Sequence, residues 1–189
     1  AIIMVCPIAA RAWQENADSS YSDYIEELVK SCAHWLCEGH IVRLASSQTS
    51  LDLPLVEGIA TRVRAMAGET ASLHIDDAES VSHYIQLAKG ADLVVASRLH
   101  ALILAAVAET PLVAISPTRK ATQLMKDLGL GDYCIELQKI QAEHLQALVN
   151  KILSNRIALH DGLKVLLGQY RHDLDVHYQK IKMMAAGTL

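Results

Sequence analysis

Short apolar runs alternate along this chain with longer segments in which apolar residues recur every three or four positions. The clearest short runs are rich in β-branched residues and are bounded by polar, glycine or proline positions, so they are predicted strands at residues 2–5, 41–45, 92–96 and 111–115. Residues 72–75 and 133–137 are weaker strand candidates. The periodic segments are predicted helices at residues 21–37, 55–66, 78–88, 99–108 and 120–128.

The predicted strands are continuous apolar runs rather than alternations of apolar and polar positions. Such strands are typical of a parallel sheet that helices cover on both faces. The pattern therefore predicts an α/β fold, a Rossmann-like doubly wound parallel sheet sandwiched by helices. Ligands of such sheets bind beyond the carboxyl ends of the strands. The segments that follow the strands are the places to look for function, namely residues 7–13, 46–50, 76–77, 97–100 and 116–120.

The last part of the chain, residues 141–189, contains two predicted helices at about 141–153 and 157–184. We expect one Rossmann-like domain over residues 1–189, with this segment as a helical extension that packs back on the domain or crosses to a neighbour. The first residues enter an apolar strand directly, without an initiator methionine. We therefore expect a fragment that lacks an amino-terminal domain.

Composition and charge exclude several classes of protein. The net charge is -4, and lysine and arginine are scattered and form no basic stripe. A nucleic-acid partner is therefore not expected. The longest apolar run has about 10 residues, against the roughly 20 that span a bilayer, so no membrane span is expected. The four cysteines lack the spacing of a zinc site or a disulfide framework, which indicates free thiols in a reducing, cytoplasmic compartment.

Ser97, Arg98 and His100 follow a predicted buried strand and open a predicted helix. Free backbone N–H groups and the helix dipole make such a junction suitable for an anion. Arg98 adds a planar fork that fits carboxylate or phosphate, and His100 adds a group that exchanges a proton near neutral pH. An alternative without function stays open, in which Ser97 caps the helix, Arg98 pairs with a surface carboxylate and His100 is a partly buried structural histidine.

A second segment with the same character follows the next predicted strand. Ser116 ends that strand, and Arg119 and Lys120 open the next helix. Arg11, after the first strand, is a third candidate cation. Because the carboxyl ends of parallel strands meet at one edge of the sheet, these groups favour a ligand with two negative charges. No metal is expected, and the acidic pair Asp76 and Asp77 is interpreted as the cap of the following helix.

Residues 91–103 (ADLVVASRLHALI), residues 113–116 (VAIS), Lys120 and residues 124–130 (LMKDLGL) together resemble the polysaccharide pyruvyl transferase family. The resemblance covers residues 81–134. It implies a two-domain transferase of the GT-B type, of which this chain would be the carboxyl-terminal, donor-binding domain. Members of the family transfer the enolpyruvyl unit of phosphoenolpyruvate to two hydroxyls of a sugar, which leaves a cyclic pyruvate ketal and free phosphate.

The resemblance also implies roles for single residues. Arg98 and His100 match the donor-binding and catalytic motif, to which Ser97 and Leu99 belong, and Lys120 matches a basic position suited to the phosphate. Ser116 and Arg119 would line the same subsite, although residues 116–119 lack the Tyr-Asp-Pro expected before the lysine. Arg11 follows the first strand with altered spacing.

From these roles we expect His100 to transfer the proton, with Arg98 and Arg11 holding carboxylate and phosphate. No cofactor is implied, since phosphoenolpyruvate is the donor substrate. The acceptor would be a glycan, including lipid-linked glycans at the inner face of the membrane.

Two other functions stay open. One is the donor domain of a GT-B glycosyltransferase or another nucleotide-sugar enzyme, for which Glu136 is the candidate ribose ligand. The other is a non-catalytic domain that keeps the fold as a binding surface. Melting of the protein in the presence of phosphoenolpyruvate or of a UDP-sugar distinguishes them.

Overall fold

The computed structural model describes residues 1–9, 19–69 and 71–185 of the chain. In this part of the chain, strands form a 6-stranded sheet whose order is β3-β2-β1-β4-β5-β6. Every pairing of neighbours is parallel. The strands are β1 (Ile2–Cys6), β2 (Ile41–Ser46), β3 (Leu73–Asp77), β4 (Leu93–Ala96), β5 (Leu112–Ser116) and β6 (Cys134–Glu136).

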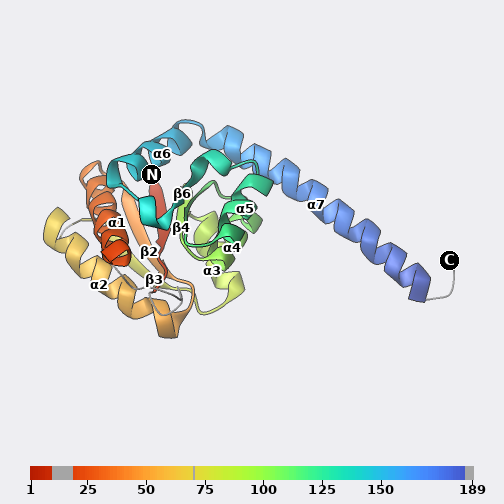
Figure 1. Cartoon of the computed structure of the whole chain (residues 1–189), viewed down its shortest axis with the longest axis horizontal. Helices are drawn as coiled ribbons and strands as arrows, with labels where there is room; N and C mark the ends of the chain where they lie inside the picture. The colour runs from red at the N-terminus through yellow and green to blue at the C-terminus, as the bar shows by residue number, and fades with distance from the viewer. Residues whose placement is uncertain (10–18, 70, 186–189) are drawn as a thin grey trace.

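Helices cover both faces of the sheet, as Figure 1 shows. On one face α1 (Ser19–Cys37) packs against α2 (Thr49–Ala67) and α6 (Ala142–Ser154). On the other face α4 (Leu99–Val107) packs between α3 (Val81–Lys89) and α5 (Arg119–Asp127). Every residue of β4 and β5 is buried, as expected for central strands covered on two sides. The predicted fold class, a Rossmann-like doubly wound parallel sheet sandwiched by helices, is confirmed.

The start of α2 differs from the prediction. The sequence predicted a loop at residues 46–50 and a helix from residue 55, whereas α2 begins at Thr49 and contains Pro54. Pro54 is the sixth residue of the helix and has no backbone N–H, so it removes the one intrahelical hydrogen bond that this position would donate. The apolar face formed by Val56, Ile59 and Val63 is buried and holds the helix on the domain. The earlier start places Asp52 in the first turn of α2.

The interpretation of Asp76 and Asp77 as a helix cap is wrong. Both residues belong to β3, and Ser80 caps α3 by accepting a hydrogen bond from the His83 N–H at 3.1 Å. The Asp76 carboxylate instead accepts hydrogen bonds from Arg43 Nε at 2.8 Å and Nη2 at 2.6 Å. The partner of Asp76 thus comes from the neighbouring strand β2. The local sequence around Asp76 contains no sign of this contact.

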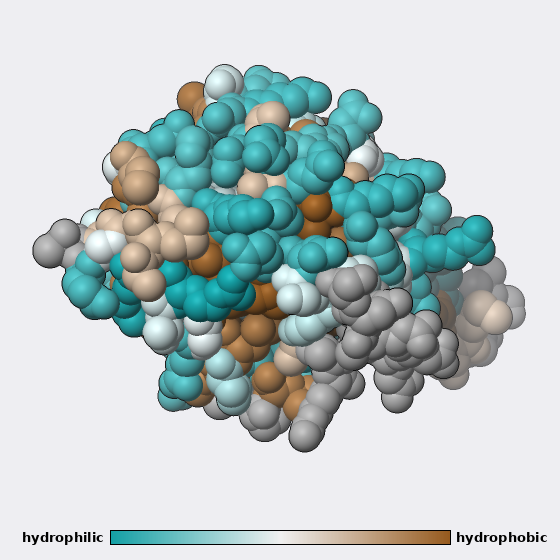
Figure 2. Space-filling model, turned by 60° about the vertical axis from the view of Figure 1, so that its left-hand side comes forward, coloured by the Kyte–Doolittle hydropathy of each residue, from teal (hydrophilic) through white to brown (hydrophobic). Residues whose placement is uncertain are grey.

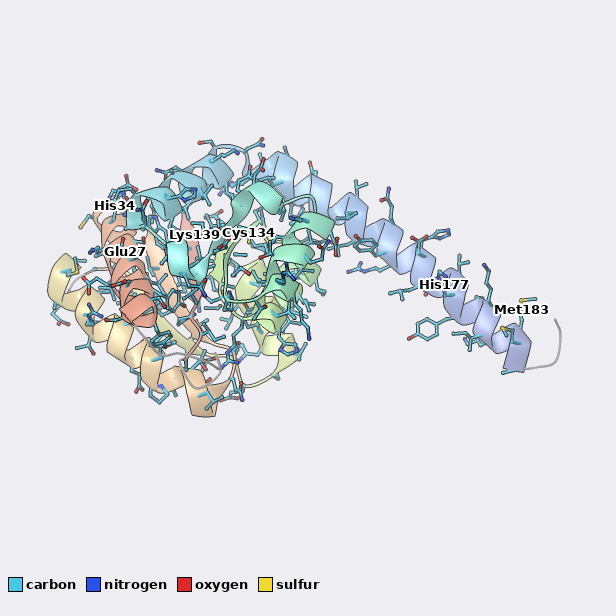
Figure 3. All side chains as sticks on the ribbon, in the orientation of Figure 1. Glu27, His34, Cys134, Lys139, His177 and Met183 are labelled. Atoms are coloured by element: carbon cyan, nitrogen blue, oxygen red, sulfur yellow. The ribbon has the colours of Figure 1, made fainter. Side chains whose placement is uncertain are left out.

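The last helix, α7 (Arg156–Ala185), leaves the body of the domain and projects from it (Figure 1). Leu163 is buried at its base, whereas Leu174, Tyr178 and Ile181 are more than half exposed. Figure 3 places His177 and Met183 on the projecting part. None of the helices in the described part of the chain combines the length and the apolar character that a membrane span requires.

On the face shown in Figure 2, hydrophilic side chains cover most of the surface, and apolar side chains reach the surface over a smaller central area. This agrees with a core that runs as one cluster through the sheet and the inner sides of the helices. The bulk of the apolar residues is thus used for packing. The polar groups described next lie where the strands leave that core.

Candidate functional site

Strands β1 and β4 lie side by side at the centre of the sheet and end at the same level, with Cys6 opposite Ala96. After β1 the chain passes to the face covered by α1, and after β4 it passes to the face covered by α4. This is the switch point of a doubly wound sheet, where ligands of such folds bind. The Ser97 N–H donates to the Cys6 carbonyl at 3.0 Å, so the two strand ends are tied together just before α4 begins.

Arg98 forms a bidentate ion pair with Asp52. Its Nε donates to Asp52 Oδ2 at 2.5 Å, and its Nη2 donates to Oδ1 at 2.8 Å. The Asp52 side chain is fully buried, and Oδ1 also accepts a hydrogen bond from the Ala9 N–H at 3.1 Å. Arg98 therefore pairs with a buried carboxylate in the first turn of α2 and not with a carboxylate on the surface.

Ser97 is held from the opposite face of the sheet. Tyr24 Oη lies 2.9 Å from Ser97 Oγ and accepts a hydrogen bond from the Ile8 N–H at 3.2 Å. Tyr21 Oη donates to the Ile8 carbonyl at 3.0 Å. Burial raises the pKa of Tyr24, so its phenol stays neutral and keeps its proton for a hydrogen bond. These contacts fix the segment after β1 against the first residue after β4.

The start of α4 has no side-chain cap. Arg98, rather than Ser97, is the residue at the cap position, and its side chain makes no capping hydrogen bond. Within the part of the chain that the structure describes, no acceptor is recorded for the first N–H groups of α4, so these donors remain for water or a ligand. The interpretation of Ser97 as a simple helix cap is wrong.

The other two residues of the motif, Leu99 and His100, differ in their exposure to solvent. His100, the second residue of α4, is exposed, and the structure records no hydrogen bond for its side chain among the described residues. Leu99 is half-buried and packs against the core. His100 is thus free to reach a ligand. For Leu99 the visible role is packing, and its contact with substrate stays a prediction.

The start of α5 carries the second predicted set. Ser116 is buried at the end of β5, and its Oγ donates to the Thr118 carbonyl at 2.7 Å. Thr118 caps the helix, and Arg119 and Lys120 follow as exposed cations. They lie on a surface groove of ≈ 790 Å³ that also has Lys126, Glu136 and Gln138 in its lining.

The structure thus groups the predicted residues in two adjacent sets. Ser97, Arg98 and His100 lie at the start of α4, and Ser116, Arg119 and Lys120 lie at the start of α5, after the neighbouring strand. Neither Arg98 nor His100 lines the groove beside α5. Arg11 lies outside the described residues, so its place in either set stays a prediction.

Sequence reasoning missed Asp52 and Tyr24, which hold the motif in place. A signal for Asp52 was present, because it shares one helical face with Val56, Ile59 and Val63, all of which are buried. A carboxylate on an apolar face needs a partner inside the protein. The predicted helix start after Pro54 hid this pattern.

A thiol lies at the end of β1, close to the junction. Cys6 is fully buried and its Sγ lies 3.2 Å from Tyr84 Oη. Burial raises the pKa of Cys6 to about 12, so it is a neutral thiol near neutral pH. Cys6 is a structural residue and is not suited to act as a nucleophile.

Comparison with known proteins adds the family. The model of the polysaccharide pyruvyl transferase family matches residues 5–119, so the match begins at β1 and ends just before Lys120. No curated protein sequence matches the chain.

The similar solved structures show the fold. A mutant of the Thermobaculum terrenum O-GlcNAc transferase is 15% identical, with a TM-score of 0.60 over 98% of this chain and 37% of that one. The trehalose-6-phosphate phosphatase amino-terminal domain of Candida albicans is 13% identical, with a TM-score of 0.54 over 88% of this chain and 38% of that one. This chain thus spans well under half of either protein. Because the family model covers more than half of its residues, the chain belongs to the polysaccharide pyruvyl transferase family.

Proposed function

We propose that this chain is the donor-binding part of a pyruvyl transferase that moves the enolpyruvyl group of phosphoenolpyruvate to two hydroxyls of a glycan. The observation that carries the proposal is the start of α4. An uncapped helix N-terminus, an arginine fixed beside it and an exposed histidine two residues further on lie together at the switch point of the sheet. Together they suit a small anion whose reaction needs a proton.

Phosphoenolpyruvate carries a carboxylate and a phosphate on the same carbon framework. In our proposal Ser97, Arg98 and the N–H groups of α4 bind the carboxylate. Arg119 and Lys120 at the start of α5 bind the phosphate, with Ser116 shaping that subsite and Arg11 adding charge. Arg98 and Asp52 neutralise each other, so the net positive charge that a phosphate needs would come from the α5 side.

The chemistry requires one proton to reach the methylene carbon of the donor, which becomes a methyl group. A sugar hydroxyl then bonds to the adjacent carbon and loses its proton. The bond from that carbon to the phosphate oxygen breaks and phosphate leaves. The second sugar hydroxyl then attacks the same carbon and closes the ketal, and the phosphate takes up the proton of this hydroxyl. The two protons released by the hydroxyls therefore equal the two protons gained, one by the methyl group and one by the phosphate.

His100 is the group that we assign to proton transfer. Its exposure at the second position of α4 leaves the imidazole accessible, and such a group contributes about 10²- to 10⁴-fold in rate. Lys120 would stabilise the charge on the departing phosphate. The reaction as proposed uses phosphoenolpyruvate as substrate and draws on no cofactor.

The acceptor is proposed to be a glycan, including lipid-linked glycans at the cytoplasmic face of a membrane. The family to which the chain belongs is named for polysaccharide acceptors. We propose that a further domain, amino-terminal to this one, provides most contacts with that acceptor.

A nucleotide-sugar enzyme is the second candidate. Glu136 and Gln138 line the groove beside α5, where an acid and an amide could bind ribose hydroxyls. Glu136 also pairs with Lys139 at 2.8 Å, so it is not free to do so without a change of partner. Because an exposed pair of this kind is weak, the contact does not decide between the candidates, and the family match is what favours the pyruvyl transferase.

Ligand-dependent melting tests the proposal. A ligand that binds the native state at 100 times its Kd adds about 2.7 kcal/mol of stability. We expect phosphoenolpyruvate to raise the melting temperature and UDP-N-acetylglucosamine to leave it unchanged, with the phosphoenolpyruvate shift lost in Lys120→Ala. A shift with the UDP-sugar alone would support the second candidate. A shift with neither, in the protein at its full natural length, would support a non-catalytic domain.

A further inference from the structure

We propose that Asp52 is a positioning residue for substrate binding. It holds the Arg98 guanidinium in one orientation, so that a defined edge of that group is available to the anion at the start of α4. The identity of the anion rests on the proposed function, whereas the orientation rests on the geometry of the pair. The family match gives no role to any single residue.

The ion pair uses one edge of the guanidinium and leaves another. Nε and one N–H of Nη2 are taken by the two oxygens of Asp52. Both N–H groups of Nη1 and the second N–H of Nη2 remain, and the structure records no acceptor for them among the described residues. One N–H of Nη1 and the second N–H of Nη2 lie parallel and form the outer edge of a planar fork, which matches a carboxylate or phosphate in two parallel hydrogen bonds.

Asp52 is itself fixed from several sides. Its side chain is fully buried, its Oδ1 accepts from the Ala9 N–H at 3.1 Å, and its own N–H donates to the Gln48 carbonyl at 2.9 Å. Arg98 is also largely buried, with 14% of its side chain exposed. Neither partner can change rotamer without breaking buried hydrogen bonds, so the outer edge of Arg98 has one direction.

A buried ion pair is a poor source of stability, because removing two charges from water offsets most of their attraction. What the pair does provide is orientation. Asp52 cancels the charge of Arg98, so Arg98 discriminates between ligands by the geometry of its outer edge. A lysine at position 98 could keep an ion pair with Asp52 but has no second edge to offer.

A double-mutant cycle on the protein at its full length tests this inference, with Asp52→Asn, Arg98→Gln and both together. Asparagine keeps the shape of the side chain but directs an amide or a neutral oxygen at Nε. We expect Asp52→Asn to weaken binding of phosphoenolpyruvate, measured by calorimetry, by at least about tenfold. In the Arg98→Gln background the same change should have no further effect, because a residue that acts through Arg98 loses its influence with it.

Asp76→Asn is the matched control. Asp76 makes the same two-point contact with Arg43, Nε to Oδ2 at 2.8 Å and Nη2 to Oδ1 at 2.6 Å, but on β3 and β2. If losing any such ion pair had a general effect on the protein, Asp52→Asn and Asp76→Asn would weaken the binding of phosphoenolpyruvate equally. We expect Asp76→Asn to bind as the unmodified protein does.

Other outcomes decide the inference as clearly. Equal weakening by Asp52→Asn in both backgrounds, or by Asp76→Asn, would overturn it. If Asp52→Asn does not fold, Arg98→Lys replaces it, and full affinity in that variant would overturn the inference. If the unmodified protein does not bind phosphoenolpyruvate, the proposed function fails, and the same cycle with pyruvate, a carboxylate without a phosphate, judges the orientation of Arg98 by itself. Binding of neither anion would overturn both.

Discussion

Tyr24 Oη and Ser97 Oγ, 2.9 Å apart, join α1 to the first residue after β4. The same phenol oxygen accepts the Ile8 N–H, so one buried hydroxyl connects both sides of the switch point. Together with Asp52, which binds Ala9 and Arg98, it makes a polar layer beneath the motif. The position of the motif therefore depends on residues that are distant from it in sequence.

Replacing Tyr24 by phenylalanine should lower the free energy of unfolding by about 1–3 kcal/mol, because the buried Ile8 N–H and Ser97 hydroxyl lose their partner. Urea denaturation measures the change. Tyr21→Phe is the comparison, since Tyr21 Oη donates to the Ile8 carbonyl from a half-buried position. Equal losses in the two variants would contradict a special role for Tyr24.

His100→Ala should leave stability unchanged and reduce ketal formation by about 10²- to 10⁴-fold. The reason is that His100 is exposed and makes no recorded hydrogen bond within the described residues, so folding does not depend on it. Release of phosphate from phosphoenolpyruvate in the presence of acceptor measures the rate. His172→Ala, an exposed histidine on α7, is the control. Near-normal turnover by His100→Ala would remove the assignment.

Asp52→Ala should destabilise the fold by about 3–5 kcal/mol, because it leaves Arg98 largely buried without its partner. The double variant Asp52→Ala, Arg98→Leu should recover much of that loss, since no buried charge remains. Thermal and urea denaturation of both variants check this. A double variant less stable than the single one would show that the ion pair itself stabilises the fold.

Alkylation should distinguish the four cysteines in the native protein. Burial raises the pKa of Cys6 and of Cys32 to about 12, so neither offers thiolate near neutral pH, whereas Cys37 is exposed. Mass spectrometry after iodoacetamide should therefore find Cys37 modified first, Cys134 more slowly, and Cys6 and Cys32 protected. Modification of all four in guanidinium is the control, and rapid native labelling of Cys6 would contradict the buried environment.

Stability should fall as the solution becomes alkaline. The folded state holds the thiol protons of Cys6 and Cys32 up to a pKa of about 12, while an unfolded thiol releases its proton near 9.0. Stability is therefore complete below about pH 9 and decreases as pH rises from there toward 12. Urea denaturation across this range measures the slope, and Cys32→Ala should make it shallower. An unchanged slope in that variant would exclude Cys32 as a source.

The sequence was sufficient for the sheet because its strands are continuous apolar runs, and for the start of α4 because Ser97 follows such a run directly. The sequence was insufficient to predict the burial of Asp52 and its pairing with Arg98. A proline two residues later suggested that the helix began after it, and the pairing with Arg98 spans 46 positions of chain. The interpretation of Asp76 as a helix cap was wrong for the same reason, since its partner Arg43 comes from a different strand. Contacts between distant segments decide which polar residues are buried, and local patterns do not contain them.

The pairing of Asp52 with Arg98 has a consequence for how sequences of this kind can change over time. A single replacement at either position leaves a buried charge alone, so it is disfavoured even where the ligand is no longer needed. Lineages that lose Arg98 should therefore lose Asp52 as well, and the two positions should vary together. Their joint replacement by apolar residues would mark relatives that have kept the fold and abandoned the anion.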